Sequence, residues 1–145
     1  MNSHVITLAG ALEGCGCRVW RREFVWVFVF GEGLSISAPP PWRVVTPGGI
    51  AFGADDDGHQ FGLPQPVDGE ARTNELLKGQ TVVELEVDDR TADLKIMFDG
   101  GARLDFFNNS SGYDGWQASV PVDGRELAIF AQGGGALISW WPKSE

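Results

Sequence analysis

Short runs of alternating hydrophobic and polar residues cover most of the chain, and Gly or Pro separates each run from the next. β-branched and aromatic residues dominate these runs, and turn residues return after roughly eight to twelve positions, which is typical of a sandwich or a barrel. The pattern therefore predicts an all-β fold. Helix is expected only as short turns at residues 7–13 and 69–78, where Thr73 or Asn74 is the candidate N-cap.

Eleven strands are expected along the chain. The first five are residues 17–22, 24–30, 34–38, 42–46 and 50–52, and the other six are residues 81–88, 92–98, 103–107, 116–120, 127–131 and 136–141. Tight hairpin turns are expected at Asp99-Gly100-Gly101, Asp123-Gly124 and Gly133-Gly134-Gly135, because these residues favour the backbone conformations that short hairpin loops need.

Two of these strands are expected to be buried in different ways. In residues 92–98 every second side chain is apolar and the residues between include Asp93 and Lys95, so one face should lie in the core and the other in solvent. In residues 24–30 aromatic side chains occupy one face and valines the other. Both faces of that strand should therefore be covered.

Two segments of the chain look like copies of one unit. Each begins with Leu-x-Gly, at Leu12 and at Leu77, continues through strands and a Gly-containing turn, and reaches a Trp, at Trp42 or at Trp116. We therefore predict a single domain made of two similar antiparallel β units that pack as a sandwich or a split barrel. The units are expected at about residues 8–52 and 77–141, and the polar connection between them at residues 53–76.

The charge of the chain limits the kinds of partner that are expected. There are 20 acidic and 11 basic residues, which give a formal net charge of -9. Because this charge opposes contact with phosphates, DNA and RNA are not expected as partners, whereas a basic protein would be attracted. Cys15 and Cys17 are too close in sequence for an internal disulfide and too few for a zinc site, so both are interpreted as reduced thiols.

The first residues do not have the composition of a targeting segment. Met1-Asn2-Ser3-His4 carries no Lys or Arg, and the apolar stretch that follows is too short for a signal peptide or a membrane span. The cytoplasm is therefore the expected location, without attachment to a membrane.

No catalytic group, metal or cofactor is expected from the sequence. Asp55, Asp56 and Asp57 lie beside His59, but a calcium loop needs ligands at alternating positions and a distal acid, which this segment lacks. A solvated turn explains the three carboxylates more simply. An enzyme is accordingly less expected than a binding protein.

A second candidate segment runs from residue 108 to residue 116 with the sequence Asn-Asn-Ser-Ser-Gly-Tyr-Asp-Gly-Trp. It combines hydrogen-bonding groups with the only Tyr of the chain and a Trp, a mixture that suits interfaces. Tyr113, Asp114 and Trp116 are its candidate contact residues. The alternative is a structural loop that Trp116 anchors in the core.

Several strings of residues resemble a family of small, uncharacterised bacterial all-β proteins, some of whose members look like immunity proteins encoded beside polymorphic toxins. These strings are Pro41-Trp42-Arg43, Asp57-Gly58-His59-Gln60-Phe61-Gly62-Leu63-Pro64, Asp93-Leu94-Lys95-Ile96-Met97-Phe98, Ser110-Ser111-Gly112-Tyr113-Asp114-Gly115-Trp116-Gln117 and Gln132-Gly133-Gly134-Gly135. The resemblance implies fold and context for nearly the whole chain, and it implies no catalytic residue. The Asp triplet at residues 55–57 departs from the family pattern.

The leading hypothesis is a non-catalytic, immunity-like protein whose acidic surface binds a basic toxin or another cytosolic protein. The predicted contact residues are Asp55, Asp56, Asp57, His59, Tyr113, Asp114 and Trp116, and the acidic surface extends to Glu84, Glu86 and Asp88. One alternative is a small-molecule or hydrolytic site near His59 and Tyr113. Another is a structural subunit that pairs through Trp141 or Phe107, so a monomer and a homodimer are both open.

Overall fold

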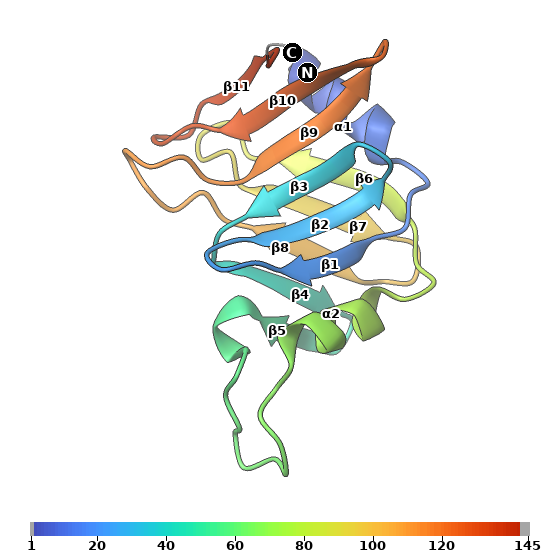
Figure 1. Ribbon diagram of the computed structural model, residues 1–145, viewed down its shortest axis with the longest axis vertical. Helices are drawn as coiled ribbons and strands as arrows, with labels where there is room; N and C mark the ends of the chain where they lie inside the picture. Colours follow the sequence, from blue (N-terminus) through green and yellow to red (C-terminus); the bar gives the residue numbers. More distant parts are fainter. Residues whose placement is uncertain (1, 143–145) are drawn as a thin grey trace.

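The computed structural model describes residues 2–142 and contains two helices, one 3-10 turn and eleven strands (Figure 1). In chain order these are α1 (Ser3–Leu12), β1 (Arg18–Arg21), β2 (Trp26–Gly31), β3 (Leu34–Ala38), β4 (Trp42–Thr46), β5 (Gly49–Gly53), η1 (Ala54–Asp56), α2 (Gly69–Leu77), β6 (Val82–Val87), β7 (Leu94–Phe98), β8 (Arg103–Phe106), β9 (Gln117–Val122), β10 (Arg125–Ala131) and β11 (Leu137–Trp140). Each of the eleven expected strands overlaps one of these strands.

The strands form two antiparallel sheets that pack face to face. Sheet A has the order β1-β2-β3-β9-β10-β11, and sheet B has the order β5-β4-β8-β7-β6. The predicted all-β sandwich is confirmed, and within residues 2–142 the sheets stay separate and form no closed barrel. The turn between β9 and β10 is the expected two-residue hairpin, because Asp123 and Gly124 both have positive φ, at 50° and 76°.

One helix closes each open side of the sandwich. α1 contacts β6 and β11, and α2 contacts β1 and β5, so each helix bridges an edge strand of sheet A and an edge strand of sheet B. α1 begins at Ser3, earlier than the predicted residue 7, because the Asn2 side chain accepts a hydrogen bond from the His4 N–H at 2.7 Å and caps the helix.

α2 begins at the predicted residue but with a different cap. The N-cap is Asp68, whose Oδ1 accepts a hydrogen bond from the Ala71 N–H at 3.2 Å. The predicted cap Asn74 instead joins the helix to the sheet. Its Oδ1 accepts from the N–H of Val19 at 2.8 Å and its Nδ2 donates to the Val19 carbonyl at 3.0 Å, as a neighbouring strand would.

The two halves of the chain follow the same order of elements. α1 precedes three neighbouring strands of sheet A and then two strands of sheet B, whereas α2 precedes three neighbouring strands of sheet B and then β9 and β10 of sheet A. Both helices end at a buried Leu, Leu12 or Leu77. The halves therefore exchange strands, and neither half forms a sheet alone. That they are repeats of one unit agrees with this order and stays a prediction.

Aromatic side chains fill the space between the sheets. Phe28 meets Trp42 and Phe106 edge to face, with ring centroids 4.9 and 4.8 Å apart, and Trp26 meets Trp42 at 5.0 Å. Because Trp26 and Phe28 belong to sheet A and Trp42 and Phe106 to sheet B, these contacts hold the two sheets together.

The burial of β7 and β2 tests the predicted alternation. In β7 Leu94, Ile96 and Phe98 are buried, which confirms the expected half-solvated strand. In β2 the aromatic face is buried, but Phe24 lies before the strand and is 81% exposed. The valine face of β2 is only half-buried, so the expected cover on both faces is wrong for that face.

Both helices are short, with ten residues in α1 and nine in α2, whereas a membrane span needs roughly 20 residues. Within residues 2–142 no helix meets the length and hydropathy that crossing a bilayer requires.

Candidate functional site

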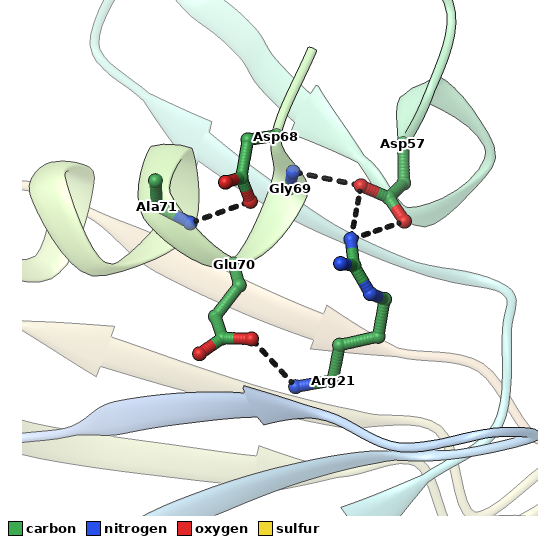
Figure 2. A network of polar contacts seen from close by, with 6 residues as sticks. All are labelled: Arg21, Asp57, Asp68, Gly69, Glu70 and Ala71. Carbon is green, nitrogen blue, oxygen red and sulfur yellow. Dashed lines mark hydrogen bonds and ion pairs between the residues drawn. The ribbon is translucent and has the colours of Figure 1, made fainter.

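The predicted acidic segment lies where β5 leads into the connection to α2, and its third carboxylate is used inside the protein. The Asp57 carboxylate accepts two hydrogen bonds of 2.9 Å from Arg21 Nη1 and one of 2.8 Å from the Gly69 N–H (Figure 2). Glu70 of α2 also accepts from the backbone N–H of Arg21, at 3.4 Å. Asp57 therefore ties β1 to the start of α2.

The other two acids of the triplet differ from each other. Asp56 Oδ2 accepts a hydrogen bond from the Gly53 N–H at 2.9 Å, which fixes the 3-10 turn η1 onto the end of β5. Asp55 is exposed and makes no hydrogen bond or ion pair with any residue in the range 2–142. Among the three acids of this triplet, Asp55 alone has a carboxylate that forms no hydrogen bond or ion pair within the described chain.

His59 begins a loop that extends away from the sandwich at the bottom of Figure 1. Backbone hydrogen bonds of 2.8 Å from Gly58 to Val67 and from Val67 to His59 close the loop at its base. The exposed His59 ring stacks on Phe61, with centroids 5.7 Å apart, and Phe61 and Leu63 are 67% and 51% exposed. The loop is thus ordered at its base and apolar at its tip.

The loop between β8 and β9 carries the other predicted contact residues. Tyr113 is 84% exposed, and Asp114 Oδ1 accepts from the Gly133 N–H at 3.2 Å. Trp116 corrects the prediction: it is 1% exposed, and its indole N–H donates to the Ala92 carbonyl at 2.8 Å. A side chain at this depth cannot contact a partner, so Trp116 anchors the loop.

The structure does not bring His59 and Tyr113 together. Their loops leave the sandwich at different places, the first beyond β5 and α2 and the second between β8 and β9 (Figure 1). The grooves beside the two loops, of about 490 and about 310 Å³, have no lining residue in common. No shared site for a substrate follows from this arrangement.

One carboxylate of the described chain is fully buried, and arginines surround it. Asp105 of β8 is 1% exposed; Arg43 Nε donates to it at 2.8 Å and Arg103 Nε at 2.7 Å. Burial raises the pKa of Asp105, but the hydrogen bonds from both arginines outweigh burial and hold this pKa below its usual range. A general acid needs a raised pKa, so this cluster suits a structural ion pair.

The two thiols are free, and neither has the features of a nucleophile. Burial strongly raises the pKa of Cys17, so this thiol stays protonated at neutral pH. Cys15 is half-buried, and its Sγ lies 3.5 Å from the Ala11 carbonyl oxygen. Within residues 2–142 no group of three or more His, Cys, Asp or Glu side chains is arranged to hold a metal ion.

A group of carboxylates lies along and just after β6, at an edge of sheet B. A groove of about 560 Å³ runs between this strand, the start of α1 and the start of β11. Within residues 2–142 four acidic residues and no Lys or Arg line it: Glu84, Glu86, Asp88 and Asp89. Its apolar lining comes from Val5, Leu85, Val87, Ala136 and Leu137. We call this feature the β6 groove.

Sequence reasoning found three of these four acids, because they alternate with apolar residues along a predicted strand. It missed Asp89 and the apolar residues of α1 and β11, which lie about 50 to 80 positions away in the chain and reach the groove only through the fold. No sequence pattern within residues 81–89 predicts contacts with α1 and β11.

Comparison with known proteins adds nothing to this geometry. No protein-family model, no curated protein and no solved structure matches the chain.

Proposed function

We propose that the protein is a non-catalytic binding protein that holds a basic segment of another cytoplasmic protein in the β6 groove. The observation that carries the proposal is the lining of the groove, which among the described residues has four carboxylates and no Lys or Arg around an apolar base. Lys and Arg side chains fit such a surface, because their charged heads pair with carboxylates while their aliphatic stems cover apolar residues. The net charge of -9 adds attraction at a distance.

The backbone of β6 supports an extended conformation for the bound segment. The Asp88 N–H donates to the Asp93 carbonyl at 2.9 Å, so by the alternation of an antiparallel pair the backbone groups of Leu85 and Val87 point away from β7. No residue in the range 2–142 forms a backbone hydrogen bond with these groups. An extended partner segment can therefore add to this edge by main-chain hydrogen bonds.

Asp88 has a second role that fixes one end of the groove. Its Oδ1 accepts hydrogen bonds from the N–H groups of Arg90 and Thr91, at 2.8 and 3.0 Å. These two bonds lower the pKa of Asp88, so the carboxylate keeps its charge in mildly acidic solution. Substituting Asp88 would disturb the turn as well as the charge, and the test below leaves it unchanged.

The immunity-like interpretation makes a basic toxin the partner that we propose first. It rests on the family resemblance of the sequence and on the acidic groove. A cytoplasmic location agrees with two free thiols and is part of the same proposal.

The test is affinity capture with the tagged protein from host lysate at low and at high salt, with captured proteins identified by mass spectrometry. We expect one basic protein that is lost at high salt. The double variant Glu84→Gln, Asp89→Asn should lose it. The matched control Glu13→Gln, Glu126→Gln removes the same charge outside the groove and should retain it. Equal capture by both variants would refute the groove as the binding site.

A further inference from the structure

The outer face of sheet A carries few charged residues, among them Glu126 near the start of β10. Strand registers place two rows of side chains on it, each with one residue from every strand of the sheet. The first row is Trp20, Val27, Ser37, Gln117, Phe130 and Ile138, and the second is Arg18, Val29, Ser35, Ser119, Ala128 and Trp140. The single charge in these rows is Arg18, on the edge strand β1.

The opposite outer face shows that this neutrality is a property of sheet A alone. On sheet B one cross-strand row consists of Gly53, Arg43, Asp105, Lys95 and Glu86, and all of these except Gly53 are charged. The two rows described on sheet A hold one charged residue among twelve, whereas this row of sheet B holds four among five. Depletion of charged residues is one compositional feature of the centre of protein interfaces, and enrichment in aromatic residues, such as Trp20 and Trp140 at the margins, is another.

In the described chain no helix lies on the neutral face, although Ala128 within it is fully buried. In Figure 1 sheet A lies in front and neither helix crosses it, since α1 and α2 lie at the two open sides of the sandwich. The side chains at both margins are accordingly exposed: Trp20 by 42% and Trp140 by 50%. The alternating pattern of β2 calls for cover on both faces, and the chain itself supplies cover for only one.

We propose that the outer face of sheet A binds the same face of a second copy of this protein. Apolar residues occupy both margins, with Trp20 and Val27 at one and Phe130 and Ile138 at the other, and small polar residues occupy the middle. A two-fold axis parallel to the strands places each apolar margin against the opposite margin of the partner. The same axis places the serine-containing middle of one sheet against the middle of the other.

The net charge of the protein and the area of the outer face of sheet A both favour a second copy as the partner on this face. Two molecules that each carry a charge of -9 can approach closely only where their carboxylates are absent. Six strands about 4.8 Å apart and about 17 Å long give a footprint of roughly 500 Å² per copy, so a pair covers about 1,000 Å², the lower limit for a specific interface. Corrugation by side chains raises the accessible area above this footprint.

The pairing is tested by analytical ultracentrifugation over a wide range of concentration. We expect the unmodified protein to form a dimer, and Ser37→Arg to weaken the dimer by at least about a hundredfold, because two like charges would meet at the centre of the interface. Met97→Arg places the same charge on the outer face of sheet B and should leave the dimer intact.

Circular dichroism and thermal unfolding check that each variant folds. Ser119→Arg, on the neighbouring strand β9, is a second variant that places a charge at the centre of the proposed interface. A monomer at every concentration of the unmodified protein would overturn the proposal without any variant. So would a dimer that persists in folded Ser37→Arg or Ser119→Arg. The β6 groove lies at another side of the molecule, so capture of a basic partner is a separate result.

Discussion

The pairing of Asp105 with Arg43 and Arg103 places a buried ion cluster on the outer surface of sheet B. Asp105→Asn keeps the shape of the side chain but removes the charge that accepts three hydrogen bonds from the two guanidinium groups. We expect the free energy of unfolding at neutral pH to fall by about 1.5–3 kcal/mol, the usual range for hydrogen bonds to a charged group. Urea denaturation measures this difference, and an unchanged midpoint would contradict the assigned role.

Comparison of the unmodified protein with Asp105→Asn also gives a prediction about the pH dependence of stability. The pKa of Asp105 is lower in the folded protein than in the unfolded chain. Its stabilisation is therefore fully present above the unfolded pKa, about 4, and is lost as the pH falls through the folded value. The difference in stability between the unmodified protein and Asp105→Asn should shrink on acidification. A difference that stays constant from neutral to acidic pH would show that ionisation of Asp105 is not the cause.

Asp55 and Asp57 show why residue roles were hard to predict from the sequence. The two acids look equivalent in the chain, yet one is solvated and the other binds Arg21, which lies 36 positions earlier. Strand alternation is a local property and can be read from neighbouring residues. A contact between residues in separate elements depends on how the sheets pair, and no local pattern records it.

At the scale of elements, the position of the loop at residues 58–67 depends on the contacts of Asp57 with Arg21 and Gly69. Asp57→Asn should weaken the link between β1, the loop and α2 by about 1 kcal/mol, because it removes an ion pair that is partly exposed. Amide hydrogen exchange at Gly58 and Val67, which close the loop, should become faster. Asp55→Asn is the matched control and should leave both amides unchanged; an equal effect of the two variants would contradict the distinction.

The Asn74 amide is one of the groups that attach α2 to the edge of sheet A. Asn74→Ala removes both hydrogen bonds to Val19, and we expect a loss of about 1–2 kcal/mol in the free energy of unfolding together with faster exchange of the Val19 amide. Glu75→Ala alters the exposed neighbouring position and should have little effect. If both variants unfold at the same denaturant concentration, the amide does not hold the edge strand.

The strands themselves were predictable to within a few residues, and the predicted turns identified hairpin partners such as β7–β8 and β9–β10, but the pairings between the two halves were not predictable. Alternation in residues 92–98 identifies both β7 and its buried face, because burial of every second residue leaves a direct mark on the sequence. The pairing of β3 with β9 and of β4 with β8 joins strands from different halves of the chain. Turn residues show where a strand ends and do not show which sheet the next strand enters.

At the scale of the whole molecule, the exchange of strands makes the two halves depend on each other. Sheet A takes three strands from each half, and sheet B takes β4 and β5 from the first half and three strands from the second. The ring centroids of Trp42 and Phe28, both of the first half, are 4.9 Å apart, and Phe28 packs on Phe106 of the second half. The core is therefore shared, and unfolding of the whole protein is expected to be a single cooperative transition.

Cleavage of the loop at residues 58–67 tests this dependence directly. A protease site inserted between Gly62 and Leu63 breaks the chain at the exposed tip, away from every strand pairing. We expect the nicked protein to elute as one particle of unchanged size, because the β3–β9 and β4–β8 pairings hold the fragments together, and to separate only in denaturant. Each fragment expressed alone should lack a cooperative unfolding transition, since it leaves an apolar sheet face uncovered. Fragments that part in native buffer, or that fold independently, would show that the halves are separate domains.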